Sequence, residues 1–130
     1  MSRVSTRRRA LVLCGAGLPT LAVACARREP PDRRVRVALA SLEGSGRVEI
    51  EHQGEPAEVV RTESGIVARS LLCSHFGCRL EWQPGRGRYH CPCHQGEFDR
   101  DGRPVAGPPT QPLRAIPTEI VGRDILVGER

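Results

Sequence analysis

The chain has 130 residues, which leaves room for one small domain once a leader is set aside. Its formal charge of +5 is concentrated at the N-terminus, because residues 1–34 hold eight arginines against two acidic residues, whereas residues 35–130 hold twelve arginines against thirteen. A nearly neutral main segment lacks the basic patch of a nucleic-acid-binding protein, so we exclude that class of function.

Residues 1–26 have the features of an export signal or of a membrane or lipid anchor. Three arginines, Arg7–Arg9, precede an apolar stretch rich in glycine and alanine that ends in small residues. The paired arginines resemble a twin-arginine export signal, and the segment Ala22–Cys25 resembles a bacterial lipoprotein box in which Cys25 would carry the lipid. Cleavage with release and an uncleaved anchor are the alternatives, although the apolar run is shorter than the ~20 residues of a membrane span.

Residues 27–34 are predicted to be a charged, proline-containing linker, and residues 35–130 a single domain. No long helical periodicity follows. Short alternating runs separated by glycine and proline predict an all-β fold. The predicted strands are Val35–Ala38, Arg47–Glu51, Ala57–Arg61, Ile66–Leu72, Leu80–Gln83, Arg88–Cys91, Ile116–Val121 and Asp124–Val127.

Two short motifs carry the chemistry of the chain. Cys73-Ser74-His75 and Cys91-Pro92-Cys93-His94 each supply cysteine and histidine at close spacing. Two thiolates and two neutral imidazoles are the ligand set of a [2Fe-2S] centre in which cysteines hold one iron and histidines the other. The same four residue types could also form a closed tetrahedral zinc site, which is the structural alternative.

The segments CSHFGC (residues 73–78) and CPCH (residues 91–94) resemble the two cluster-binding loops of Rieske proteins, of the branch whose loops are tied by a disulfide. This resemblance implies a small antiparallel β-sandwich with a cluster-binding subdomain that carries two loops. It also implies one [2Fe-2S] cluster, with Cys73 and Cys91 on one iron and His75 and His94 on the other.

The resemblance assigns further residues around the site. Cys78 and Cys93 would form the disulfide, and Gly107-Pro108-Pro109 resembles the third loop that covers the cluster in this family. A zinc site would explain neither feature. His52 and His90 are interpreted as structural or surface residues.

Two positions depart from the family pattern. Quinol-oxidising, high-potential members typically have a serine and a tyrosine where this chain has Gly96 and Phe98, and the hydroxyls of those residues donate hydrogen bonds to cluster sulfurs. Fewer donors, together with the negative charge of Glu97, predict a lower reduction potential.

The predicted function is a membrane-tethered Rieske protein on the extracytoplasmic, periplasmic face of a bacterial membrane that carries single electrons in a respiratory or oxidase chain. No catalytic residue is assigned. The expected partners are a cytochrome b or c or a molybdopterin subunit, and quinol, with the membrane reached through the N-terminus. The alternatives are the iron-sulfur subunit of a bc-type quinol:cytochrome c reductase, the small subunit of a periplasmic molybdenum oxidase, a cytoplasmic Rieske ferredoxin and a zinc-stabilised binding module.

Overall fold

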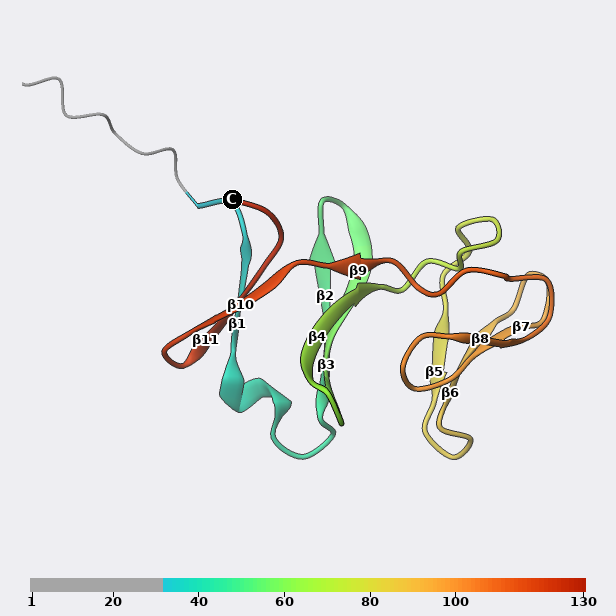
Figure 1. Ribbon diagram of the computed structural model, residues 1–130, viewed down its shortest axis with the longest axis horizontal. Helices are drawn as coiled ribbons and strands as arrows, with labels where there is room; N and C mark the ends of the chain where they lie inside the picture. Colours follow the sequence, from blue (N-terminus) through green and yellow to red (C-terminus); the bar gives the residue numbers. More distant parts are fainter. Residues whose placement is uncertain (1–31) are drawn as a thin grey trace, which may run out of the picture. The chain divides into compact units, whose positions relative to one another are not determined.

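The structure is a computed structural model that describes residues 32–130 (Figure 1). The predicted export signal, Cys25 and the first part of the predicted linker lie outside the described residues. The described part is built from short strands and one turn of 3-10 helix, in agreement with the predicted all-β class. These elements are β1 (Val35–Ala38), η1 (Leu39–Leu42), β2 (Arg47–His52), β3 (Glu55–Thr62), β4 (Gly65–Ser70), β5 (Glu81–Gln83), β6 (Arg88–Cys91), β7 (Gly96–Phe98), β8 (Pro104–Ala106), β9 (Ala115–Ile116), β10 (Thr118–Val121) and β11 (Asp124–Val127).

The strands form three antiparallel sheets. Their orders are β1-β11-β10, β2-β3-β4-β9 and β5-β6-β7-β8. The first two sheets share one apolar core, to which Val37, Val59 and Ile125 contribute, and together they form the predicted sandwich. The β5–β8 sheet has a core of its own, which includes Leu80, Tyr89 and Phe98. It corresponds to the predicted cluster-binding subdomain and is the group of short strands on the right of Figure 1.

Strand β3 is buried on both faces. Alternation along the strand turns Ala57 and Val59 into the core of the sandwich. The intervening Glu58 points to the opposite face, where its carboxylate meets Tyr89 of the β5–β8 sheet. A charged side chain is therefore enclosed between the sandwich and the cluster-binding sheet.

The predicted strand Ile66–Leu72 runs from Gly65 to Ser70 in the structure, and two larger differences have a clear physical reason. The predicted strand Ile116–Val121 is divided at Pro117, because proline has no N–H with which to continue a ladder. Residues before Pro117 pair with β4, and residues after it pair with β11. In addition, β7 and β8 were not predicted, since each is three residues long and contains a glycine or a proline.

Candidate metal centre

Three loops carry the candidate site residues. The first joins β4 to β5, the second joins β6 to β7, and the third joins β8 to β9. The first loop is closed by backbone hydrogen bonds, in which the Cys73 N–H donates to the Cys78 carbonyl and the Gly77 N–H donates to the Cys73 carbonyl, both at 2.8 Å. Gly77 has φ = 71°, a conformation that glycine adopts without strain. These hydrogen bonds fix the position of Cys73 relative to Cys78.

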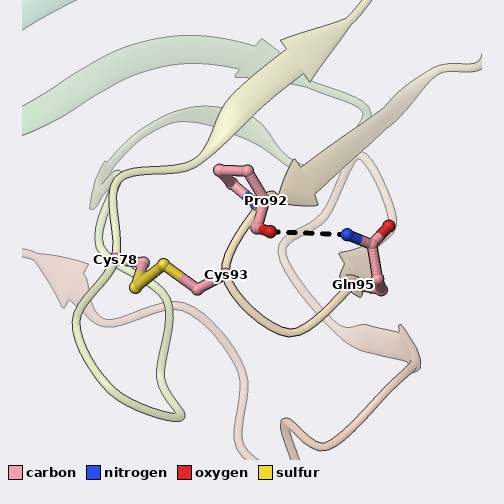
Figure 2. Close-up of a disulfide and its surroundings, with 4 residues drawn as sticks. All are labelled: Cys78, Pro92, Cys93 and Gln95. Atoms are coloured by element: carbon pink, nitrogen blue, oxygen red, sulfur yellow. Dashed lines mark hydrogen bonds between the residues drawn. A yellow bond between two sulfur atoms is a disulfide. The ribbon is translucent and has the colours of Figure 1, made fainter.

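A disulfide between Cys78 and Cys93 joins the first loop to the second, which confirms the pairing implied by the resemblance (Figure 2). The second loop is also held internally, because the Gln95 side chain donates a hydrogen bond to the Pro92 carbonyl at 3.3 Å. The sulfur of Cys91 lies within 4.8 Å of both disulfide sulfurs. Those three sulfurs do not form a metal site, since two of them are bonded to each other and offer no thiolate.

The two candidate cysteine ligands are free and lie in the interior. Cys73 is 4% exposed and Cys91 1% exposed, and both belong to the core of the β5–β8 sheet. Burial raises the pKa of the Cys73 thiol, and the neighbouring Cys91 thiol raises it further. A pair of free buried thiols is suited to a metal, because a bound cation stabilises the thiolate form of both.

The two candidate histidine ligands lie side by side nearer the surface. Their ring centroids are 5.1 Å apart, His75 is half-buried, and His94 is exposed. Nδ1 of His75 is buried and has no hydrogen-bond partner within the described residues. Because His75 follows the buried Cys73 by two residues, this unpartnered ring nitrogen suits a metal group that takes nitrogen and sulfur ligands. Phe76, which is 72% exposed, packs against His75 and adds an apolar surface next to the two histidines.

The third loop touches both of the others. Gly107 has φ = 80°, and a Cβ placed on it would lie 2.7 Å from Cα of Gly96, the first residue of β7, where the second loop ends. A Cβ placed on Gly96 would lie 2.7 Å from Cγ of Pro109. The Ser74 hydroxyl of the first loop donates a hydrogen bond to the Gln111 carbonyl at 2.7 Å. These three contacts were not predicted from the sequence, because they join residues far apart along the chain, and the role of Gly107-Pro108-Pro109 as a cover for the cluster stays a prediction.

The expected effect of Glu97 requires correction. Along β7 its side chain points to the face opposite Gly96 and Phe98, and its carboxylate pairs with Arg86 at 2.6 Å and Arg88 at 2.8 Å. Hydrogen bonds from these two guanidinium groups hold the pKa of Glu97 below its usual range. Its negative charge is therefore compensated locally, and the prediction of a lower potential depends on the missing hydroxyls at Gly96 and Phe98 alone.

The sequence did not predict that the carboxylate of Glu58 contacts the core that contains the two thiols. Glu58 of β3 accepts a hydrogen bond from the hydroxyl of Tyr89, which is fully buried two residues before Cys91. Burial and the adjacent carboxylate raise the pKa of Tyr89 to about 12. The available signal was the position of Glu58 in the otherwise apolar run Ala57–Val60, where a carboxylate requires a buried partner.

The described residues, 32–130, include no helix with the length and apolar character needed to cross a membrane. The family model for the Rieske [2Fe-2S] domain matches residues 35–117. The chain belongs to the Rieske [2Fe-2S] family. It accordingly binds one [2Fe-2S] cluster and functions in electron transfer. The zinc alternative is set aside.

Curated relatives match this Rieske domain over parts of their length. A carotenoid phi-ring synthase of Chlorobaculum tepidum is 37% identical over 58% of this chain and 12% of its own. The cytochrome b6-f complex iron-sulfur subunit of Chlorobaculum thiosulfatiphilum is 29% identical over 77% of this chain and 59% of its own. The cytochrome b6-f complex iron-sulfur subunit 3 of Nostoc sp. is 30% identical over 77% of this chain and 51% of its own. The chain thus spans little more than half the length of these subunits.

Two solved structures cover similar parts of the chain. The cyanobacterial plasma membrane Rieske protein PetC3 from Synechocystis PCC 6803 is 32% identical, with a TM-score of 0.62 over 73% of this chain and 99% of its own. The ferredoxin of carbazole 1,9a-dioxygenase from Nocardioides aromaticivorans is 31% identical, with a TM-score of 0.54 over 75% and 98%. Membrane-associated and ferredoxin-type Rieske proteins therefore both share this fold.

Proposed function

We propose that this Rieske protein is a one-electron carrier tethered to the extracytoplasmic face of a bacterial membrane, with its cluster held by Cys73, Cys91, His75 and His94. The observation that carries the ligand assignment is the grouping of two free buried cysteines with two adjacent imidazoles at the tip of the three loops. Bound in this way, a mixed cysteine–histidine cluster supplies a one-electron centre at roughly −150 to +300 mV, against about −400 mV for ferredoxins with cysteine ligands only.

The arrangement of the proposed ligands suggests which side of the site a redox partner approaches. Cys73 and Cys91 are shielded from water, whereas His94 is exposed and His75 is half-buried. Each histidine has a second ring nitrogen that can hold or release a proton when the first is bound to metal. The imidazole edge is therefore the place at which a partner would approach for transfer of an electron, and of a proton where quinol is the donor.

The extracytoplasmic location is proposed from the leader and the disulfide. The twin-arginine-like signal suits a protein whose cofactor is inserted before export, and a disulfide such as Cys78–Cys93 persists in an oxidising compartment. A cytoplasmic ferredoxin with the same fold has no need of either feature. We further propose that Cys25 is lipidated and anchors the protein.

The partner we favour is a cytochrome b or c, because several matching relatives are named as iron-sulfur subunits of cytochrome b6-f complexes. The second candidate is accordingly the iron-sulfur subunit of a bc-type quinol:cytochrome c reductase. The small subunit of a molybdenum oxidase has support only from the leader, the disulfide-bearing Rieske domain and Phe98. Co-purification from membranes with a cytochrome b or with a molybdopterin subunit would decide between the two assemblies.

Electron paramagnetic resonance and metal analysis of the purified protein test the ligand assignment. We expect two irons per chain and the low average g value of a mixed cysteine–histidine cluster, both lost in Cys73→Ala and in His94→Ala. His52→Ala is the matched control and should keep the signal. An intact cluster in Cys73→Ala would contradict the assignment.

The tether is tested separately in cells. Substitution of the Arg7-Arg8 pair by lysine should block export, and Cys25→Ala should release an exported protein from the membrane fraction. A Cys25→Ala protein that stays in the membrane fraction would instead support an uncleaved anchor.

A further inference from the structure

A buried charge cluster lies between the sandwich and the β5–β8 sheet, and we define it as Arg47, Glu58 and Arg69. Nη1 of Arg47 donates to Glu58 Oε2 at 3.0 Å, and Nε of Arg69 lies 3.4 Å from Glu58 Oε1. The side chains of Glu58 and Arg69 are 2% and 5% exposed, and that of Arg47 is 18% exposed. Two guanidinium groups thus face a single carboxylate, which leaves one positive charge in excess.

Stability accounts for Arg47, whose guanidinium lies 3.6 Å from the centre of the Trp82 ring, better than it accounts for Arg69. Nε and Nη2 of Arg69 are buried without an aligned hydrogen-bond partner among residues 32–130. Leaving donors of a buried cation unpaired has a free-energy cost, and replacing buried ion pairs by apolar residues often stabilises a protein. A charge kept in the interior despite that cost suggests a role in the site nearby.

The candidate cysteine ligands lie in the adjacent core. Tyr89 connects the two regions, because its hydroxyl contacts Glu58 and its ring lies 5.6 Å from the guanidinium carbon of Arg69. The same ring belongs to the apolar core that contains Cys73 and Cys91. The buried ring of Tyr89 therefore links the buried charge cluster to the core that contains the thiols, and charges in such a buried environment are poorly screened.

We propose that the buried charge cluster raises the reduction potential of the iron-sulfur site. This inference rests on the proposed ligands Cys73 and Cys91. One-electron reduction adds a negative charge to the site, and a buried positive charge nearby stabilises the reduced form. The absence of hydroxyl donors at Gly96 and Phe98 lowers the reduction potential. The positive charge that Arg47 and Arg69 carry in excess over Glu58 offsets part of that decrease.

Exposed charges near Arg69 do not cancel this effect. Glu63 and Asp101 line the hollow on the outer side of Arg69 together with Arg103, and all three are exposed. Water and salt screen exposed charges strongly, whereas they screen buried ones weakly. The effect of Arg69 should accordingly persist at high ionic strength.

Redox titration of the full-length holoprotein tests the proposal, at one pH and at both low and high salt. Arg69→Met removes the surplus charge and should lower the midpoint potential, whereas Glu58→Gln removes the carboxylate and should raise it. Arg69→Lys keeps the charge and should stay near wild type. The double variant Glu58→Gln/Arg69→Met restores the charge balance and should also return to near wild type. Arg123→Gln, a charge change of the same size at an exposed position in the turn between β10 and β11, is the control for long-range effects.

Opposite shifts in the two single variants, with recovery in the double variant, would support the proposal, because a purely structural disturbance would not reverse sign. Shifts in the same direction, or shifts no larger than that of Arg123→Gln, would overturn it. If Arg69→Met does not hold a cluster, absence of an upward shift in Glu58→Gln overturns it on its own. Failure of the ligand assignment is distinct, since it would appear as a cluster signal that survives Cys73→Ala.

Discussion

Gly96 and Pro109 are in direct contact, and this contact limits which side chains the second loop accepts. Gly96 is buried opposite Cys91 in the β6–β7 ladder, and Pro109 of the third loop occupies the space where a side chain at position 96 would begin. A serine there could not simply be added to this fold. Pro109 fits in its observed position because residue 96 has no side chain.

Gly96→Ser should therefore lower the free energy of unfolding by roughly 1–3 kcal/mol, the usual effect of overpacking. Chemical denaturation of the holoprotein would measure it. Gly85→Ser is the control, because a Cβ on Gly85 meets nothing within 4 Å and its φ lies outside the left-handed region. The double variant Gly96→Ser/Pro109→Ala should regain part of the loss, and wild-type stability in Gly96→Ser alone would contradict the packing argument.

Tyr89 is the only tyrosine of the chain, so its titration can be followed directly. Its pKa, raised from 10.0 to about 12, predicts that tyrosinate absorption appears near pH 12. Since the folded state keeps the proton longer than the unfolded state, the associated stability is fully present below pH 10 and is lost as pH rises towards 12. Glu58→Gln should shift the ultraviolet titration to lower pH, because it removes the neighbouring negative charge. An unshifted midpoint in that variant would rule out the contribution of Glu58.

The three loops act as one element, although they lie far apart in sequence. The disulfide joins the first to the second, the Ser74–Gln111 hydrogen bond joins the first to the third, and the Gly96–Gly107 contact joins the second to the third. Each loop is therefore supported by the other two. Loss of one connection should loosen the whole tip.

Removal of the disulfide by Cys78→Ser/Cys93→Ser should lower the free energy of unfolding by about 3 kcal/mol, the value of the chain-entropy model for a loop of this length. The sequence separation of the two cysteines is 15. Equilibrium denaturation would measure the loss, and treatment of the wild type with a thiol reductant should reproduce it. Stability equal to that of the oxidised wild type would show that the other two connections suffice.

The sequence predicted the elements with clear alternation and those marked by turns. The strands Val35–Ala38, Arg88–Cys91 and Asp124–Val127 were predicted with the observed bounds, and the cysteine pairing followed from the family motif. Long-range contacts were not accessible in this way. The approach of Gly107 to Gly96 and the meeting of Arg47, Glu58 and Arg69 depend on how separate sheets pack, which no local pattern encodes.

At the scale of the whole described region, two apolar cores differ in what supports them. The core of the sandwich consists of aliphatic side chains, including Val59 and Val127, from β1 and β11 of one sheet and from β3, β4 and β9 of the other. The core of the β5–β8 sheet contains Cys73 and Cys91 among its few members, and its strands are short. The second core should depend on bound iron more than the first.

Removal of iron by chelation should lower hydrogen-exchange protection in β6 and β7 more than in β3 and β11. The physical reason is that unliganded thiols leave the smaller core without its central cross-link, whereas the sandwich keeps all its contacts. Amide exchange of the holo and iron-free forms, measured residue by residue, would check this. Equal loss of protection in both regions would mean that the two cores unfold as one unit.

The pairing of β1 with β11 also has a consequence for synthesis on the ribosome. Val35 lies opposite Val127, so the sheet β1-β11-β10 cannot close until almost the whole chain has been translated. The strands β5–β8, in contrast, follow one another along the chain and need no later segment to pair. The β5–β8 sheet can therefore form during translation, before β11 is available to pair with β1. The cluster-binding sheet would then fold before the sheet β1-β11-β10.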